Sequence, residues 1–401
     1  YEENNFHNQT YLNVLQLLLR LFNDTNNYIF AIDVGQKAQT TSTSLYGNYN
    51  ETHLNILTGL YTAYVNSFSH ERALQCLMKM LEISEKIYGE KSDYFLTILN
   101  NLYTYYSDIG SFQKSLEINK KVIGLRREIS GTRDLNYLND MANMAATYIE
   151  LGEFALALEI NQEISVIQKD VLGVNDKAYL STMCNLAMNY SYFGNHERAL
   201  ELFNKIIEAI KETYGVKNRE YLRCLGGLSN VYNETGKYQK ALGILLELVE
   251  LQKELFGIKD PDYLTSLNNL AICYSRLNNF QKSLEINQII VDIRKITFGE
   301  KHPDYLISLG NMAMDYSSLG NYSKALEINE KVVKSAREVF GEKHPNYFIA
   351  QGNLAGAELD FSDFNSAFNH FQIMLKGLQD YVVSNFAIMT EQQRGQLWNS
   401  W

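Results

Sequence analysis

The chain has 401 residues, with 36 Lys and Arg against 46 Asp and Glu, so its formal net charge is −10. This acidic balance argues against a nucleic-acid-binding protein, because a surface that follows phosphates needs clustered Lys and Arg. The sequence contains no apolar run of about eighteen residues, so it predicts no transmembrane helix and no membrane partner. The cysteines show no paired spacing, which predicts neither a disulfide framework nor a metal site; they are Cys76, Cys184, Cys224 and Cys273.

A glycine recurs every 42 residues along most of the chain. A fixed period of this length indicates a solenoid, in which each unit is a helix pair that buries its apolar face only by stacking on its neighbours. The recurring glycines, used below as the origin of each unit, are Gly47, Gly89, Gly131, Gly173, Gly215, Gly257, Gly299 and Gly341.

Residues 1–46 are predicted to form a degenerate first unit. One period before Gly47 lies Asn5, after which Tyr11, Leu18 and Tyr28 fall on apolar positions of the repeat. Residues 36–44 read Q-K-A-Q-T-T-S-T-S, which predicts a loose polar segment. Terminal units of solenoids are commonly atypical because one of their faces meets water.

Residues 47–341 are predicted to form seven regular units of two helices each. In one of them Leu309, Met312, Ala313 and Tyr316 make a single apolar stripe on the first helix. A mid-unit glycine such as Gly320 permits the left-handed turn that ends this helix. Asparagine is the next-best residue for that turn, and it replaces the glycine at position 278. Prolines are expected at the first position of the first helix; they are Pro261, Pro303 and Pro345.

Residues 342–383 are predicted to form a degenerate ninth unit, followed by a C-terminal capping helix or junction at 384–401. In the ninth unit Glu358 replaces the repeated tyrosine, and Ser362 replaces the mid-unit glycine. In the last segment Thr390 followed by Gln393 is typical of a capping box at a helix start.

The segment 311–326, N-M-A-M-D-Y-S-S-L-G-N-Y-S-K-A-L, resembles the tetratricopeptide repeat (TPR). The longer 42-residue form with G-E-K-H-P-D-Y at 299–305 resembles the repeats of kinesin light chains and of bacterial multi-repeat proteins. The resemblance implies an all-α, right-handed α-solenoid of about nine stacked units. It further implies a non-catalytic scaffold that binds a protein or peptide segment and needs no cofactor.

The end of the chain adds a second resemblance. The run from Asn385-Phe386 through Met389-Thr390-Glu391 to Arg394 and Trp398 resembles the junction between repeats and a caspase-like CHAT domain in bacterial proteins. It implies that this chain is the regulatory or substrate-recruiting part of a larger protein, with the CHAT domain following residue 401. The alternative is a cargo or signalling adaptor like kinesin light chain. The compartment stays open, since both the cytoplasm and export after removal of an N-terminal signal fit a chain that begins at Tyr1.

An asparagine column provides the main candidate for ligand contact. In the resembled family the first helices line the concave groove, where a row of amides can bind an extended peptide backbone through donor and acceptor together. The alternative is that the amides bond to one another and only hold the stack. The column lies twelve residues after the unit glycines and comprises Asn101, Asn143, Asn185, Asn269, Asn311 and Asn353.

Other groove candidates lie on the same helical face, at eight, fifteen and nineteen residues after the unit glycine. They are Met188, Tyr192, Arg223, Asn230 and Arg276. Because only Arg223 and Arg276 are cationic, a clamp for an acidic peptide tail is disfavoured. His70 and His196 stand where aromatic residues stand in other units, so they are predicted to fill space rather than bind metal. The asparagines of the L-E-I-N segments in the second helices are predicted to be structural.

Overall fold

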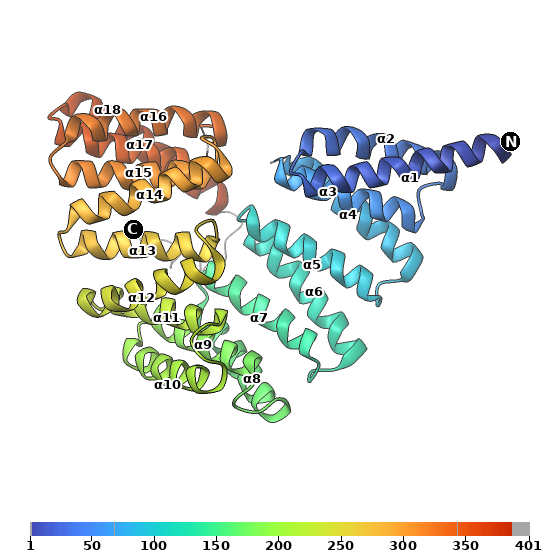
Figure 1. Ribbon diagram of the computed structural model, residues 1–401, viewed down its shortest axis with the longest axis horizontal. Coiled ribbons are helices and arrows are strands. Elements are labelled where there is room, and N and C mark those ends of the chain that lie inside the picture. Colours follow the sequence, from blue (N-terminus) through green and yellow to red (C-terminus); the bar gives the residue numbers. More distant parts are fainter. Residues whose placement is uncertain (1, 68, 343, 387–401) are drawn as a thin grey trace. The chain divides into compact units, whose positions relative to one another are not determined.

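The computed structural model describes residues 2–67, 69–342 and 344–386. In these residues all regular secondary structure is helical, with eighteen helices in nine consecutive hairpins and no strand (Figure 1). The chain divides into two compact units, each of which contains several of the 42-residue repeats. From here on, Tyr1–Val171 is called the first unit and Leu172–Trp401 the second unit. Within each unit, successive hairpins stack into an all-α solenoid, as predicted.

The first unit contains four hairpins, and the second contains five. The helices of the first unit are α1 Glu2–Asp24, α2 Tyr28–Tyr46, α3 Glu51–Asn66, α4 His70–Tyr88, α5 Asp93–Asp108, α6 Phe112–Ser130, α7 Leu135–Glu150 and α8 Phe154–Val171. Those of the second unit are α9 Lys177–Tyr192, α10 His196–Tyr214, α11 Arg219–Glu234, α12 Tyr238–Phe256, α13 Pro261–Arg276, α14 Phe280–Phe298, α15 Pro303–Ser318, α16 Tyr322–Phe340, α17 Pro345–Asp360 and α18 Phe364–Phe386.

The repeated glycines end the second helix of a hairpin. Gly341, for example, follows α16 with φ 81°, and its N–H donates to the carbonyl of Arg337. Glycine adopts this conformation without the steric cost that a Cβ imposes. In the last hairpin the same repeat position holds Val383, and α18 continues past it to Phe386.

The turn from the first helix to the second also requires positive φ. Gly320 has φ 79°, and Asn278 takes the same role with φ 58°, as the sequence predicted. The other two described non-glycine residues with positive φ, Asn26 and Ser362, occupy the same position of their own repeats. These four residues therefore mark the turn between the two helices of their hairpins.

The first helix of each regular hairpin begins with a side-chain cap. The residue three places after the unit glycine accepts a hydrogen bond from a backbone N–H of the first turn, which would otherwise lack a partner. His302 does so through Nδ1, 3.2 Å from the N of Asp304. The full series of caps is Asn50, Ser92, Asp134, Asp176, Asn218, Asp260, His302 and His344.

Ion pairs explain the Glu-Lys dipeptide that follows several unit glycines. Glu300 Oε2 lies 3.3 Å from Lys331 Nζ, and Lys301 Nζ lies 3.6 Å from Glu338 Oε2, so both residues bind the second helix of their own hairpin. Glu90 with Lys121 and Lys91 with Glu128 repeat this pattern. Since all four pairs are exposed, solvent screens them and each contributes little to stability.

Most of the tyrosines six places after a unit glycine are core residues. Tyr221, Tyr263 and Tyr305, six places after their glycines, are at most 5% exposed. The second tyrosine column, seventeen places after the glycine, packs below a cation from the following helix: Lys240 Nζ lies 5.5 Å from the Tyr232 ring centroid, and Lys282 Nζ lies 5.2 Å from that of Tyr274. Burial of large rings and cation–π contact both stabilise the hairpin.

Two sequence-based expectations were wrong. Residues 36–44 are not loose but belong to α2, where Ala38 and Ser42 are fully buried and the Thr40 hydroxyl donates to the carbonyl of Gln36. A disulfide joins Cys184 to Cys224, with their Cα atoms 5.9 Å apart. Their separation of 40 residues, close to the period, places them on the consecutive first helices α9 and α11.

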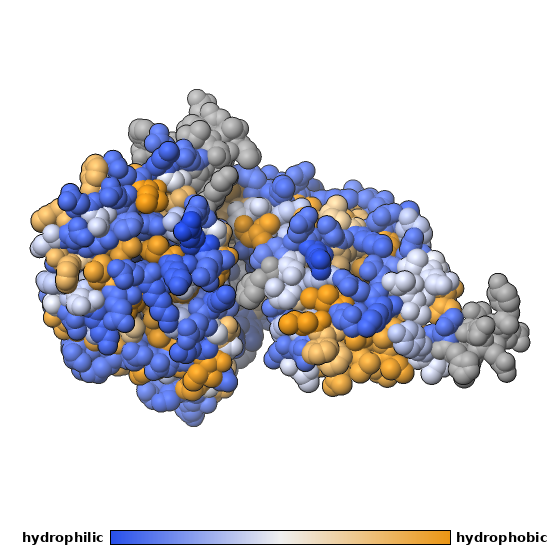
Figure 2. Space-filling model, turned by 90° about the horizontal axis from the view of Figure 1, so that it is seen from above, coloured by the Kyte–Doolittle hydropathy of each residue, from blue (hydrophilic) through white to orange (hydrophobic). Residues whose placement is uncertain are grey.

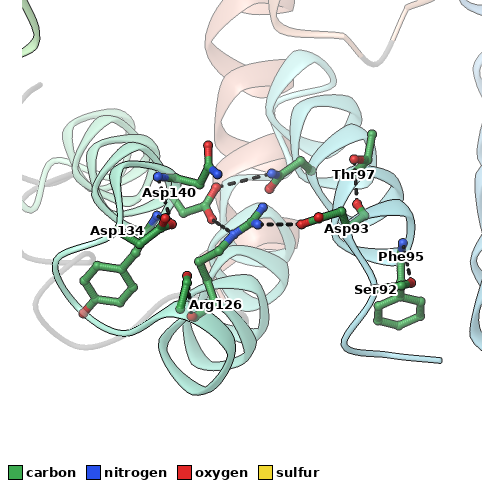
Figure 3. A network of polar contacts seen from close by, with 11 residues as sticks. Ser92, Asp93, Phe95, Thr97, Arg126, Asp134 and Asp140 are labelled. Carbon is green, nitrogen blue, oxygen red and sulfur yellow. Dashed lines mark hydrogen bonds and ion pairs between the residues drawn. The ribbon is translucent and has the colours of Figure 1, made fainter. Parts of the chain in front are cut away.

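A buried ion pair links neighbouring hairpins of the first unit (Figure 3). Arg126 on α6 contacts Asp140 on α7 at 3.4 Å and Asp93 on α5 at 3.1 Å. Asn100 Nδ2 donates to Asp140 from α5 at 3.3 Å. Burial raises the pKa of the Asp140 carboxyl, an effect that Arg126 and Asn100 oppose.

The L-E-I-N asparagines are buried, as expected of structural residues. Asn119, Asn161, Asn287 and Asn329 are at most 4% exposed. Asn287 Nδ2 donates to Asp315 Oδ2 on the next hairpin at 2.6 Å, and burial raises the pKa of Asp315. The Asn287–Asp315 bond therefore joins α14 to α15 and satisfies polar groups whose burial would otherwise be costly.

The face shown in Figure 2 carries many hydrophilic side chains, with separate apolar patches among them. Across the part of the chain that the structure describes, no helix combines the length and apolarity needed to cross a bilayer. The segment Met389–Trp398, which carries most of the resemblance to a CHAT junction, lies outside the described residues.

Candidate ligand-binding surface

Side-chain hydrogen bonds connect the first helices of the second unit into one continuous surface. Bonds run from Arg223 to Asn185, from Asn269 to Asn230 and from Asn311 to Asn268, so α9, α11, α13 and α15 are joined in sequence order. We call this the first-helix surface. It consists of the residues eight, twelve, fifteen and nineteen places after the unit glycine on α9, α11, α13, α15 and α17, which share one helical face.

Arg223 is held by its neighbours on α9. Its Nη1 donates to Asn185 Oδ1 at 2.6 Å, and its Nη2 donates to the carbonyl and hydroxyl oxygens of Ser181 at 2.9 and 2.7 Å. Burial lowers the pKa of this guanidinium, and Glu220 opposes the shift. Arg223 and Asn185 therefore join α9 to α11, next to the Cys184–Cys224 disulfide, and most of the guanidinium's donors are already used.

Two asparagines of the predicted column donate to the preceding first helix. Asn269 Nδ2 lies 3.2 Å from Asn230 Oδ1 in an exposed pair, and Asn311 Nδ2 lies 2.9 Å from Asn268 Oδ1. Each amide retains a second N–H and its carbonyl oxygen, because an asparagine side chain has two donors and an acceptor with two lone pairs. Cross-helix bonding and ligand contact are thus compatible at these residues.

The remaining predicted residues differ in exposure. Tyr192 is 43% exposed and Arg276 is exposed, whereas Met188 is half-buried. Asn353 is half-buried against α15, where a Cβ at Gly310 would lie 3.5 Å from its Nδ2.

The asparagine column also continues into the first unit. Asn101 and Asn143 are half-buried there, on α5 and α7. The backbone carbonyl of Asn143 accepts a hydrogen bond from the Tyr103 hydroxyl at 3.1 Å, which joins α5 to α7. The first helices of the first unit are therefore also linked to one another.

Sequence reasoning missed the apolar part of this surface. Ile272, Ile307, Met314 and Ile349 are 43%, 51%, 60% and 54% exposed, and all four occupy positions eight or fifteen. Extending the position-by-position comparison to α13, α15 and α17 would have identified them. The three later first helices therefore add exposed apolar side chains to this surface at positions eight and fifteen.

A Ser–His–Glu cluster borders the surface but lacks the arrangement of a catalytic triad. The Ser191 hydroxyl donates to Glu234 Oε2 at 2.6 Å and lies 3.3 Å from His196 Nδ1. In a triad the histidine lies between the nucleophile and the carboxylate, whereas here the serine lies between the other two. Over the described ranges, no group of three or more His, Cys, Asp or Glu side chains is arranged to hold a metal ion.

Comparison with known proteins decides the family. Residues 135–212, 178–254 and 220–295 each match one tetratricopeptide-repeat model, and residues 306–346 match another, so the matches together span half of the chain. The chain belongs to the tetratricopeptide-repeat family. No curated protein matches this TPR chain significantly.

Solved structures share the TPR solenoid at low sequence identity. A Rap protein complexed with Competence and Sporulation Factor is 11% identical, with a TM-score of 0.56, and the match covers 94% of this chain and 99% of that one. The apo quorum sensor NprR from B. thuringiensis is 16% identical, with a TM-score of 0.57 and the same coverage. TPR-like repeats of a putative kinesin light chain from Podosopora anserina are 24% identical with a TM-score of 0.45, covering 50% of this chain and 95% of that one. These similarities concern the fold alone.

Proposed function

We propose that this TPR chain is a non-catalytic scaffold that binds a protein or peptide segment on the first-helix surface of its second unit. The observation that carries the proposal is the row of asparagine amides, which runs from helix to helix. A single such amide would be an ordinary surface residue. A row at a fixed repeat position offers hydrogen bonds at regular intervals to one elongated partner.

The geometry of the Asn269–Asn230 and Asn311–Asn268 pairs supports this function. Asn269 and Asn311 each use one N–H to bond the preceding helix, which orients the rest of the amide before any ligand arrives. Side chains held in this way lose less entropy on binding than free ones do. The Rap structure, solved with Competence and Sporulation Factor, supports the proposal in one respect: a solenoid of this fold can hold a bound factor.

The test is selection of peptides from a phage-displayed library of random dodecapeptides on the full chain. Selected peptides should bind the wild-type chain and lose affinity for Asn269→Ala/Asn311→Ala/Asn353→Ala, while the variant keeps its melting temperature. The matched control is Asn365→Ala/Asn369→Ala, which removes exposed asparagines from α18, a second helix. Selected peptides that bind both variants as well as the wild type would refute the proposal.

Two finer proposals concern the biological context. The C-terminal resemblance supports a caspase-like CHAT domain on the same polypeptide. A reading frame that stops soon after Trp401 would refute this proposal. The 42-residue period favours, as the alternative, a cargo or signalling adaptor like kinesin light chain. Heptad repeats upstream of Tyr1 would support the adaptor, because such proteins pair through coiled coils.

A further inference from the structure

The later first helices carry an amide row with apolar side chains on both sides. Asn269, Asn311 and Asn353 form the row, at position twelve of α13, α15 and α17. Ile307 and Ile349 lie on one side of it, at position eight, and Ile272 and Met314 lie on the other, at position fifteen. All four apolar side chains are 43–60% exposed, so the row and its flanks are accessible together.

This part of the first-helix surface contains no charge at positions eight, twelve or fifteen. The other residues at these positions of α13, α15 and α17 are Thr265 and Gly356. A charged ligand group placed here would lose its hydration without gaining a counter-ion, which is unfavourable. These three positions therefore match an uncharged occupant, in contrast to α11, where they include Arg223; on the later first helices charge enters only at position nineteen, with Arg276 on α13 and Asp360 on α17.

The amide row constrains the conformation of that occupant. An apolar helix face laid over Asn269 and Asn311 would cover their free donors and acceptors without replacing their bonds to water, which is unfavourable. An extended backbone avoids this cost because it presents N–H and C=O groups along its length. Its side chains then point alternately to the two sides of the row, and both sides are apolar here.

We infer that the α13–α15–α17 part of the first-helix surface recognises an extended, uncharged peptide segment with consecutive apolar side chains. This inference rests on the proposed function and specifies its ligand class. Three first helices packed about 8–10 Å apart span about six residues of extended chain. The peptide backbone bonds to Asn269, Asn311 and Asn353, while its side chains contact the isoleucines and Met314.

The experiment uses the same random dodecapeptide library and adds charge to the apolar flanks. Peptides selected on the wild-type full chain should be enriched in runs of Leu, Ile, Val, Met and Phe. The affinity of a resynthesised peptide, measured by fluorescence anisotropy, should fall about tenfold or more for Ile307→Glu and for Met314→Glu. The matched control is Ile296→Glu on α14, where the side chain is 77% exposed and lies on a second helix.

The outcomes separate this inference from the proposed function. Selected peptides that are polar or charged, and that need the asparagines but tolerate Met314→Glu, overturn the inference and leave the proposed function standing. Apolar peptides that tolerate Ile307→Glu, or that lose equal affinity with Ile296→Glu, bind elsewhere or non-specifically and also overturn it. Peptides that bind the asparagine variant as tightly as the wild type refute both the inference and the proposed function.

Discussion

Arg126 Nε lies 3.4 Å from Asp140 Oδ2, and neither side chain is more than 11% exposed. Removing the cation leaves a buried carboxylate with only Asn100 to compensate it, while the charge of Asp134 opposes its ionisation; breaking a buried pair in this way typically costs about 3–5 kcal/mol. We therefore expect Arg126→Met to lower the free energy of unfolding of the full chain by about 3 kcal/mol or more. Urea unfolding followed by circular dichroism measures this loss, and hydrogen exchange should locate it in α5–α7.

A second substitution provides the control for this prediction. Asp140→Asn removes the buried charge but keeps a polar group beside Asn100, so Arg126→Met/Asp140→Asn should be more stable than Arg126→Met alone. If the double variant is no more stable than the single one, the loss does not come from the unpaired carboxylate.

His53 should make stability depend on pH. This side chain is fully buried at the repeat position where other units carry tyrosine or Phe95, and burial lowers its pKa from 6.5 to about 4, with a smaller contribution from Lys79. Above pH 6.5 both folded and unfolded chains hold a neutral ring. Between pH 6.5 and about 4 the unfolded chain binds a proton that the folded chain does not, so stability falls as the pH falls.

Once the unfolded state is fully protonated at this histidine, the free energy of unfolding should be lower by about 3 kcal/mol. His53→Phe, which copies Phe95, should flatten that part of the pH profile of urea unfolding. His196→Tyr is the control, because it replaces a half-exposed histidine by a ring that the repeat already uses at that position. Equal slopes for the wild type and His53→Phe would contradict the prediction.

The side-chain cap of α5 should contribute more to stability than the uncapped start of α6. Ser92 Oγ accepts from the Phe95 N–H at 3.2 Å, whereas Ser111, at the start of the next helix, makes no side-chain cap bond. Ser92→Ala should therefore cost about 1 kcal/mol, and Ser111→Ala only a few tenths. Both variants delete one hydroxyl from the same hairpin, so a difference in their melting temperatures reports the cap. If both variants lose the same stability, the cap hydrogen bond of Ser92 does not contribute measurably.

The Cys184–Cys224 disulfide should be detectable by its chemistry. Cys76 and Cys273 are free and buried, so alkylation of the denatured, unreduced chain should modify these two cysteines only. Cross-linking residues 40 apart restricts the unfolded chain and typically adds about 2–4 kcal/mol of stability. Cys184→Ser/Cys224→Ser should accordingly melt at a lower temperature. Four alkylated cysteines in the unreduced chain would contradict the bond.

The sequence was sufficient for features that repeat and insufficient for features that occur once. The hairpins, their turns at Gly320 and Asn278, and the caps at His302 and His344 all follow from positions that recur with the period. The Cys184–Cys224 bond was missed because the two cysteines occupy different positions in their repeats, and only the stacking of α9 beside α11 brings them together. The helical state of residues 36–44 was missed because stacking against the next hairpin overrides weak helix propensity.

The same reasoning could predict only part of the candidate site. The asparagine column could be read from the period, whereas its cross-helix bonds depend on which rotamer each amide adopts. Arg223 illustrates the difference: it looked available to a ligand, but it bonds to Asn185 and Ser181. The exposed apolar flanks at Ile307 and Met314 became evident only from their accessibility, since isolated apolar residues in a repeat are usually buried.

Site-specific photo-crosslinking tests the central claim most directly. A photoreactive phenylalanine analogue placed at position 314 on α15, or at position 296 on α14, is irradiated with a peptide selected on the wild-type chain, and the products are mapped by mass spectrometry. The account predicts that the peptide crosslinks at position 314 and not at position 296. Crosslinking at position 296 alone, or equally at both positions, would contradict ligand binding on the first-helix surface.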